Sequence, residues 1–332
     1  MISIIRRNTE EIDELIELTA ARKKLNTVIV EKDLWVCYLL DYLFNRCKYK
    51  EYFEFKGGTS LSKAYGLIER FSEDVDIVLK ADILGANLSS IIELDSRNQK
   101  NKLSTELNKR ALQFYKDKLK PLLEKDLYEE TNKVFEIRID ESDMAIYLKY
   151  PSSQSNEYIR NEIKLEIGPL AAWTPFESRS IKSFIAEVYP NLFEVPEFNV
   201  MVSKPIRTFW EKAVILHQEA NRVDGKVPRR YSRHYYDIYK MYYSDVKMEA
   251  LNSLDLLDEV REFTETFYNR GWAKFDEAKP GTFKLVPNEV SMPALQSDYE
   301  NMKIMIYGEM PDFNDILKTM KQLEDEINQG EQ

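Results

Sequence analysis

Two aspartates one residue apart, Asp74 and Asp76, stand at the start of an apolar run that ends at Leu79. Side chains alternate between the two faces of a β-strand, so these carboxylates point to the same face, about 6–7 Å apart. Val75 and Ile77 point to the other face, into a core. Paired carboxylates suit Mg²⁺, which takes oxygen ligands and keeps some of its waters for exchange with phosphates.

A Gly-Gly turn precedes these aspartates. Gly57 and Gly58 follow a short apolar run, and Thr59 or Ser60 can then cap a helix that continues to about Glu69. The backbone N–H groups of such a turn and the positive end of the helix dipole favour phosphate binding. Glycine lets the phosphate approach, because a Cβ would hold it away from the backbone. The turn and the aspartates together predict a site for a metal ion and the phosphates of a nucleotide.

Three lysines could neutralise a triphosphate at this site. Lys56 precedes the turn and Lys63 lies one helical turn beyond it. Lys212 lies close to the apolar stripe of a predicted helix over residues 205–220, where a lysine without a partner is poorly tolerated. Lys56 could equally be the end of a strand, and Lys212 could instead extend along the protein surface with its charge in water.

The elements that would position these residues follow from the hydrophobic pattern. Helices are expected over residues 9–23, 28–45, 99–125 and 205–220, and most of the chain after residue 250 is expected to be helical. Strands are expected over residues 134–139, 144–150, 161–167, 184–189 and 198–202. Prolines near residues 190 and 196 mark a junction between an N-terminal and a C-terminal part.

Composition indicates an ordinary globular protein. The chain has 332 residues, of which 43% are hydrophobic and 31% charged, with a net charge of −10. That charge argues against general coating of nucleic acid but allows a local basic groove. We expect a cytoplasmic protein from three features of the sequence. It has two cysteines, it shows no signal-peptide pattern, and it has no apolar run of membrane-spanning length.

The string KGGTSLSKAYGLIERFSEDVD, residues 56–76, resembles the AbiEii/AbiGii (MenT-like) nucleotidyltransferase toxins of type IV toxin–antitoxin systems. The resemblance covers roughly residues 28–325 and is strongest over residues 55–77. It implies an α/β (α+β) fold with a mixed sheet flanked by helices in residues 1–195, followed by a C-terminal helical bundle in residues 196–332. The string lacks the Gly-x-x-x-x-Gly-Lys-Ser/Thr spacing of a P-loop.

The resemblance also implies catalytic residues outside this string. Lys212 lies in a Glu-Lys-Ala-x-x-Leu-His context that is similar in the toxins, and Asp237 matches a catalytic-site aspartate of the family. The chain departs from the family at the preceding acidic position, where His234 or Tyr235 stands. Read without the resemblance, Asp237 could simply be a surface residue that pairs with Arg233 on the same helix.

A third carboxylate and an early acidic segment are further candidates. In the nucleotidyltransferase superfamily, a neighbouring strand often supplies a residue that binds metal or deprotonates the attacking hydroxyl, and Glu166 is the candidate here. It could equally be an exposed glutamate on the wet face of a strand. The segment Glu31-Lys32-Asp33 resembles one in the toxins and could abut the site, or form a solvated first helical turn.

The reaction implied is transfer of a nucleoside monophosphate from an NTP to an acceptor hydroxyl, with Asp74 and Asp76 holding two Mg²⁺ ions. The resemblance implies the 3′ end of a tRNA as acceptor, growth inhibition as the result, and a cognate antitoxin as partner. A lysine-rich helix near residues 100–120 would contact the RNA, unless it is only a solvated face. The basic loop would contribute Arg222, Lys226, Arg229, Arg230 and Arg233.

Three alternatives remain from the sequence. The same site could serve a nucleotidyltransferase that modifies a protein or a small molecule. A kinase-like phosphotransferase would keep the carboxylates, but the chain lacks His-Arg-Asp and Asp-Phe-Gly motifs. A non-catalytic antitoxin or RNA-binding module could retain the fold, although both aspartates are present. The two histidines, His217 and His234, have no serine or cysteine partner at a hydrolase spacing.

Overall fold

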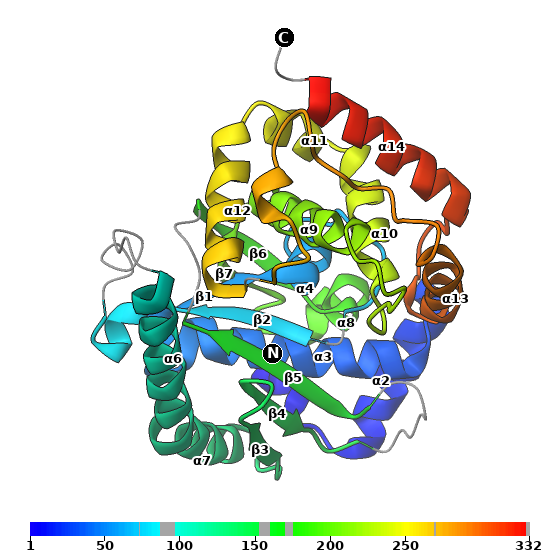
Figure 1. The fold of residues 1–332 in the computed structure, drawn as a ribbon. Helices are drawn as coiled ribbons and strands as arrows, with labels where there is room; N and C mark the ends of the chain where they lie inside the picture. The colour runs from blue at the N-terminus through cyan, green and yellow to red at the C-terminus, as the bar shows by residue number, and fades with distance from the viewer. Residues whose placement is uncertain (73, 87–96, 153–159, 170–174, 269, 330–332) are drawn as a thin grey trace.

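Seven strands form one mixed sheet in the computed structural model, which describes all residues except 73, 87–96, 153–159, 170–174, 269 and 330–332 (Figure 1). The strand order is β3-β4-β5-β2-β1-β7-β6. Their bounds are β1 (Phe53–Lys56), β2 (Asp74–Leu79), β3 (Glu136–Asp140), β4 (Ala145–Lys149), β5 (Glu162–Gly168), β6 (Phe176–Lys182) and β7 (Glu197–Ser203).

The acidic strand β2 occupies the middle of this sheet. Strand β2 pairs antiparallel with β1 and parallel with β5. On its other edge, β1 pairs parallel with β7. The remaining pairs, β3 with β4, β4 with β5 and β6 with β7, are antiparallel. The strands predicted over residues 134–139, 144–150, 161–167 and 198–202 are confirmed to within two residues, as is the mixed α/β fold class.

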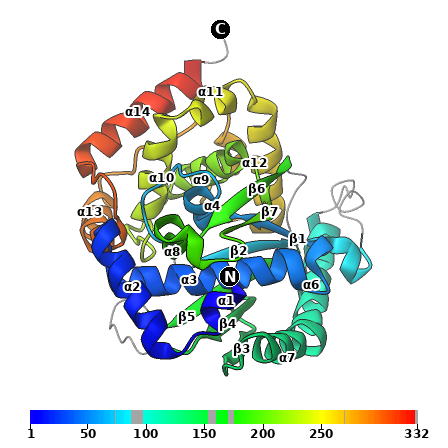
Figure 2. The ribbon, with the colours of Figure 1, turned by 180° about the vertical axis from the view of Figure 1, so that it is seen from behind.

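Helices surround the sheet and fill the C-terminal part of the chain (Figures 1 and 2). They are α1 (Ile2–Ile5), α2 (Thr9–Lys23), α3 (Thr27–Asp41), α4 (Gly57–Lys63), α6 (Arg97–Phe114), α7 (Lys120–Thr131), α8 (Phe184–Val188), α9 (Pro205–Ala220), α10 (Ser232–Tyr242), α11 (Asp245–Leu251), α12 (Leu254–Tyr268), α13 (Met292–Met302) and α14 (Phe313–Gln329). A π-helical turn over Tyr115–Leu119 joins α6 to α7, which gives the long predicted helix after residue 99.

Helix α3 crosses one face of the sheet, in front of it in Figure 2. Val75 and Ile77 of β2 are buried in the same hydrophobic core as Leu34 and Trp35 of α3. Burying the alternate apolar residues of β2 under α3 fixes the register of the strand, because a shift by one residue would expose them. The aspartates of β2 therefore face away from this core.

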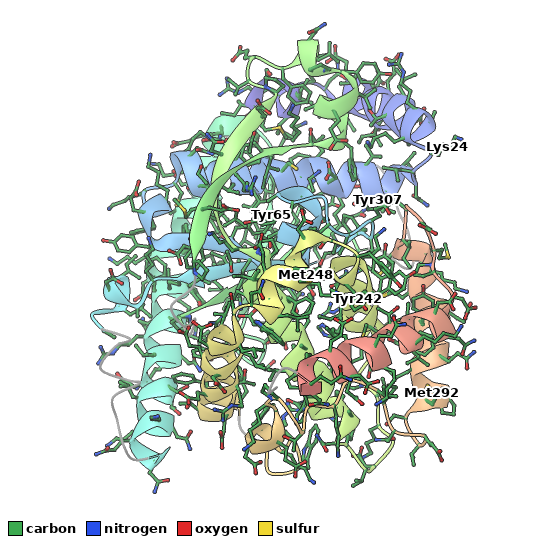
Figure 3. The ribbon with its side chains drawn as sticks, turned by 90° about the horizontal axis from the view of Figure 1, so that it is seen from above. Lys24, Tyr65, Tyr242, Met248, Met292 and Tyr307 are labelled. Carbon is green, nitrogen blue, oxygen red and sulfur yellow. The ribbon has the colours of Figure 1, made fainter. Side chains whose placement is uncertain are left out.

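A second core holds the C-terminal helices together. Helix α9 packs against α10, α11 and α12, and α10 packs against α13 and α14. This core also includes Ile68 and Phe71 from the segment that leads into β2. The backbone N–H of Tyr307, labelled in Figure 3, donates to the carbonyl of Glu69 over 2.9 Å, and the Phe71 N–H donates to Met305 over 2.7 Å. The segment before β2 is thus tied to the C-terminal part of the chain.

The predicted end of one helix and the predicted type of another element are wrong. The helix after the Gly-Gly turn ends at Lys63 and not near Glu69, since Gly66 adopts a left-handed backbone with φ of 62° and the chain then pairs with residues 305–307. The predicted strand over residues 184–189 is the short helix α8. Ser183 caps this helix by accepting a hydrogen bond from the N–H of Ala186.

The sheet extends past residue 195, because β7 runs from Glu197 to Ser203 between β1 and β6. The division of the chain at residue 195 stays a prediction. In the part of the chain that the structure describes, no helix is both long and apolar enough to span a membrane. Both cysteines, Cys37 and Cys47, are buried free thiols.

Candidate active site

Asp74 and Asp76 lie on one face of β2, as the alternation predicts. Both side chains are half-buried, whereas Val75 and Ile77 between and after them are fully buried. The two carboxylates therefore lie at the surface of the sheet opposite α3. They have enough access to water to meet a ligand, and enough burial to interact strongly with other charges.

Glu166 lies directly across from Asp76 on the neighbouring parallel strand β5, and Lys164 lies across from Asp74. The Glu166 side chain is 40% exposed and its Oε1 lies 2.6 Å from Nζ of Lys164. Burial, the negative charge of Glu166 and that of Asp74 raise the pKa of Asp76 to about 6, against the opposing charges of Lys56 and Arg233. The negative charges of Asp74 and Glu166, together with burial, thus disfavour ionisation of Asp76.

These carboxylates fit a divalent cation. Mg²⁺ typically binds one or two protein carboxylates and completes its octahedron with water and substrate phosphates. Among the described residues, no group of three or more acidic, histidine or cysteine side chains is placed so that it could hold a metal ion. Asp74 and Asp76 are the pair that could bind a cation, with further oxygens from water and substrate.

The Gly-Gly turn packs directly against Asp76. Gly57 has φ of +79°, and a Cβ built on it would lie 1.9 Å from Oδ2 of Asp76. A Cβ on Gly58 would lie 2.9 Å from Nη2 of Arg70. Glycine at these positions thus lets the backbone approach Asp76 and Arg70, a reason that adds to the predicted approach of phosphate.

The hydroxyl groups after the turn have internal partners. Thr59 is buried and its Oγ1 donates to the carbonyl of Asp74, which ties α4 to β2. Ser60 is buried and its Oγ donates to the carbonyl of Gly57 over 2.8 Å. Neither residue caps the helix, because α4 begins at Gly57 with Lys56 as its N-cap. The contact of Thr59 and Ser60 with phosphate stays a prediction. The structure does not favour it, because both hydroxyls already donate to backbone carbonyls.

Lys63 faces away from the aspartates of β2. Its Nζ lies 2.6 Å from Oδ1 of Asp33 and 4.2 Å from the ring centroid of Phe184, and the side chain is 7% exposed. A buried lysine held by a buried aspartate anchors the end of α4 on α3. The predicted contact of Lys63 with the triphosphate stays a prediction, and its ion pair with Asp33 does not favour it.

The first turns of α3 are not solvated, so that interpretation of Glu31, Lys32 and Asp33 is wrong. All three side chains are buried, because α3 is covered on every side. Burial lowers the pKa of Lys32 to about 8, against the opposing charge of Asp74. The Lys32 ammonium therefore lies within electrostatic reach of the acidic strand.

Lys212 and Asp237 meet in a buried cluster with Arg70. The Lys212 Nζ lies 2.8 Å from Oδ2 of Asp237, and Arg70 donates to both carboxylate oxygens over 2.6 and 2.7 Å. Burial alone would raise the pKa of Asp237, but Arg70 and Lys212 lower it below its usual value. Lys212 is thus held by a buried partner and does not extend along the surface. Asp237 is bound by these two cations, whereas Arg233 lies by Asp74.

Arg70 carries no signal in the sequence that marks it as a functional residue. It lies within the string that carries the resemblance, next to Glu69 and Phe71, but nothing local shows that its partner is 167 residues away. The cluster joins three elements, since Arg70 precedes β2, Lys212 lies on α9 and Asp237 on α10. It therefore sets the position of the C-terminal helices relative to the Gly-Gly turn.

The basic loop divides into paired and exposed residues. Arg233, at the start of α10, places Nη1 3.4 Å from Oδ2 of Asp74. Arg222 is bound by Glu219 at 2.6 Å and stacks on Trp272, with 4.1 Å from its guanidinium carbon to the ring centroid. Lys226 and Arg229 are exposed, and Arg230 is half-exposed.

The lysine-rich segment from α6 through the π-helical turn to α7 carries several surface ion pairs. Arg110 pairs with Glu106, Lys116 with Glu141, and Lys120 with Glu124. Such pairs are typical of a solvated face. The histidines are packed in the C-terminal part: His217 accepts from the N–H of Lys284 over 3.0 Å, and His234 is buried.

A cleft of ≈ 480 Å³ begins at Lys56, whose backbone pairs with that of Asp76 across β1 and β2. Its walls come from one side of α9, from α12 and from the loop before α10. No sequence signal indicated this cleft, because its walls are far apart in the chain. The residues that line it are Lys56, Arg207, Glu211, Ile215, Gln218, Glu219, Pro228, Tyr231, Val260, Phe263, Thr264, Tyr268 and Arg270.

A comparison with models of protein families agrees with the resemblance of the string around the Gly-Gly turn. A family model described as "Nucleotidyl transferase AbiEii toxin, Type IV TA system" matches residues 38–319. Among solved structures, MenT4, the nucleotidyltransferase toxin Rv2826c from Mycobacterium tuberculosis H37Rv, matches at 14% identity and a TM-score of 0.46, over 94% of this chain and 97% of that one. No curated protein matches the chain. The family match includes every candidate residue from Lys56 to Asp237.

Proposed function

Because this chain belongs to the AbiEii nucleotidyltransferase toxin family of type IV toxin–antitoxin systems, we propose that it transfers a nucleoside monophosphate from an NTP to an acceptor hydroxyl. One observation carries the proposal: the Gly57–Gly58 turn lies against Asp76 at the point where the charges of Asp74 and Glu166 also meet. Pyrophosphate is the leaving group.

Asp74 and Asp76, with Glu166 beside them, would hold Mg²⁺, with two ions expected. When bound, the metal supplies positive charge that lowers the pKa of the acceptor hydroxyl and stabilises the leaving pyrophosphate. The raised pKa of Asp76 supports this role, since a site with excess negative charge gains most from a cation.

The chain's own residues would bind and orient the triphosphate. The backbone of Gly57 and Gly58 offers close approach, and Lys56 and Arg233 supply positive charge on either side of the aspartates. Lys212 would neutralise phosphate charge while Asp237, itself fixed by Arg70, holds its ammonium in place. Most of the rate would come from positioning and charge stabilisation, because phosphoryl transfer needs little covalent chemistry from the protein.

For the acceptor, we propose the 3′ end of a tRNA in the cytoplasm, so that modification blocks translation and growth until a cognate antitoxin counters it. The exposed Lys226 and Arg229 support an RNA-binding role for the loop, because they present positive charge to solvent, and Arg230 and Arg233 are half-exposed. Arg222 supports it less, since Glu219 already pairs with its guanidinium.

The test is incubation of the purified protein with Mg²⁺, total tRNA and each α-³²P-labelled NTP in turn, beside the double variant Asp74→Ala/Asp76→Ala. Label on tRNA with at least one NTP, absent from the variant and from samples with EDTA, is expected. Label on protein or on a small molecule would support nucleotide transfer but show that the acceptor is not tRNA. No transfer to tRNA or to any component of a cell lysate would reject the enzyme and favour a non-catalytic module.

A further inference from the structure

The cleft beside Lys56 has a floor of opposite charges. Arg207 is almost fully buried, and its Nε lies 3.2 Å from Oε1 of Glu211, whose side chain keeps 27% of its surface exposed. The Lys56 ammonium lies 4.0 Å from the same oxygen. Burial raises the pKa of Glu211, but Lys56 and Arg207 outweigh this and hold it below its usual value. Glu211 is therefore an ionised carboxylate in the cleft at neutral pH.

The guanidinium of Arg207 is fixed on this floor. Arg207 lines the cleft, and its Nε lies within ion-pair distance of Glu211. Its Nη1 is buried and has no hydrogen-bond partner among the residues that the structure describes. The contact with Glu211 is therefore the polar contact through which Arg207 acts on the cleft.

Three aromatic side chains line the cleft beside its charged residues. Phe263 lies near Arg207, with 6.0 Å between its ring centroid and the guanidinium carbon. Tyr231 also lines the cleft, and Tyr268, 57% exposed, lies within electrostatic reach of Lys56 and Glu211. Aromatic rings beside a partly exposed carboxylate can bind a nucleobase by stacking and hydrogen bonding.

We infer that this cleft binds a nucleobase with an exocyclic amino group and that Glu211 accepts a hydrogen bond from that amine. An ionised carboxylate only accepts hydrogen bonds, so it attracts an exocyclic amino group and repels the carbonyl oxygen that uracil carries at the same position. Cytosine, adenine and guanine carry an amino group, and uracil does not. Arg207 acts as a positioning residue that holds the carboxylate of Glu211.

The inference rests on the proposed function, since it places a substrate base next to the acidic strand. Lys56 connects the two sites, because it lines the cleft and pairs in register with Asp76. The base could belong to the incoming NTP or to the last nucleotide of an RNA acceptor. Both sources present the same chemistry to Glu211, and two binding measurements separate them.

The first measurement is calorimetric titration of the whole protein with the four NTPs as analogues that cannot be cleaved between the α and β phosphates, with Mg²⁺. If the base is that of the NTP, the uridine analogue binds at least about tenfold more weakly than the best of the others. The Glu211→Gln variant reduces this ratio to about threefold or less, because a carboxamide can donate as well as accept.

The second measurement is anisotropy titration with four short RNA oligonucleotides that differ only in the 3′-terminal base. If the base is that of the acceptor, the same discrimination against uracil appears here, and Glu211→Gln removes it. The matched control is Glu106→Gln, which alters a glutamate paired with an arginine four residues away on exposed α6. This control keeps the wild-type ratios in both measurements.

A second variant allows the inference to be tested even if Glu211→Gln fails to fold. Tyr268→Leu removes an exposed aromatic ring at the cleft. In whichever measurement shows discrimination against uracil, this variant should bind every ligand about tenfold more weakly without changing the order of their affinities. No discrimination against uracil in either measurement overturns the inference, as does discrimination that persists in Glu211→Gln. Both measurements record binding alone, so absent nucleotide transfer with intact discrimination would reject the proposed reaction and keep the base site.

Discussion

Two aspartates of this protein, Asp76 and Asp237, have opposite electrostatic surroundings. Asp76 lies half-buried beside Asp74 and Glu166, and its pKa is raised to about 6. Asp237 is completely buried, yet Arg70 and Lys212 lower its pKa below the usual value. Burial opposes ionisation at both sites, so the charged neighbours decide the sign of the shift.

The two pKa shifts show which carboxylate is neutralised by side chains of the protein and which is not. Arg70 and Lys212 neutralise the Asp237 carboxylate within the protein, which is typical of a residue that positions its neighbours. At Asp76, burial and the charges of Glu166 and Asp74 outweigh those of Lys56 and Arg233, and a bound cation would reduce that repulsion. Residues of one type therefore have separate tasks, one in holding the architecture and one in meeting the substrate.

The largest expected effect comes from removing the charge of Asp76. The isosteric change Asp76→Asn should lower the rate of nucleotide transfer by at least about 10³-fold, because electrostatic stabilisation of the transition state usually contributes most to the rate of such reactions. Stability should stay equal or rise, since a repelled carboxylate disappears. Initial rates with labelled NTP, together with thermal melting without metal, measure both. A large fall in stability would mean that Asp76 supports the fold and would remove the contrast with Asp237.

The opposite result is expected for Asp237→Asn. This change leaves Arg70 and Lys212 buried without a counter-charge and should reduce the free energy of unfolding by about 3–5 kcal/mol. Urea denaturation measures the loss. The control Glu106→Gln breaks an exposed ion pair and should cost less than about 1 kcal/mol. Equal losses in the two variants would show that the Asp237 cluster is hydrated and not a closed unit.

The Gly-Gly turn allows a sharper comparison with a second glycine. Gly57 and Gly66 both have positive φ, but a Cβ on Gly57 would meet the carboxylate of Asp76, whereas one on Gly66 would meet nothing within 4 Å. Both alanine variants should lose about 1–2 kcal/mol of stability from the backbone conformation. Because the Asp76 carboxylate can swing aside, the extra effect of Gly57→Ala should fall on activity, by about 100-fold.

Paired measurements of melting and transfer rate check this prediction. Gly66→Ala should keep near wild-type activity despite its lower stability. If both variants lose activity equally, the effect comes from general destabilisation and the packing of Gly57 on Asp76 is not catalytic.

The sequence was sufficient for features that depend on local periodicity. Alternation along β2 placed Asp74 and Asp76 on one face, and the apolar stripe of residues 205–220 placed Lys212 near a core. Parallel pairing of β2 with β5 then brought Glu166 opposite Asp76, which the strand pattern made possible but did not require.

Features that depend on distant packing could not be predicted. Arg70 meets Asp237 only because residues 69–71 lie against residues 305–307, and no local pattern encodes that contact. The segment Glu31-Lys32-Asp33 looked solvated because its residues are charged, but α3 is covered on all sides and its charges are buried. The apolar run after Ser183 favoured a strand, and the helix cap at that serine prevailed.

The smallest expected effect is on the pH dependence of stability. Asp76 has a folded-state pKa of about 6 against an ordinary value of 3.8, so the folded protein retains a proton that the unfolded chain releases. The stabilising contribution is complete below pH 3.8 and is lost as the pH rises through about 6. Because the group is half-buried, we expect a loss of about 1 kcal/mol between about pH 5 and 7, or about 2–4 °C in melting temperature, in EDTA.

Glu31, whose pKa burial raises to about 7, adds a similar slope, so the comparison must be between wild type and Asp76→Asn. The difference between their melting curves isolates Asp76 and the charges that face it from Asp74, Glu166, Lys56 and Arg233. Mg²⁺ at about pH 7 should restore the lost stability in wild type by binding the folded state, and should have less effect on the variant. Asp237, with its lowered pKa, contributes no slope in this range, since its stabilisation is lost only as the pH falls below the ordinary value of 3.8. An unchanged slope in Asp76→Asn would mean that the acidic strand is not the site of excess negative charge.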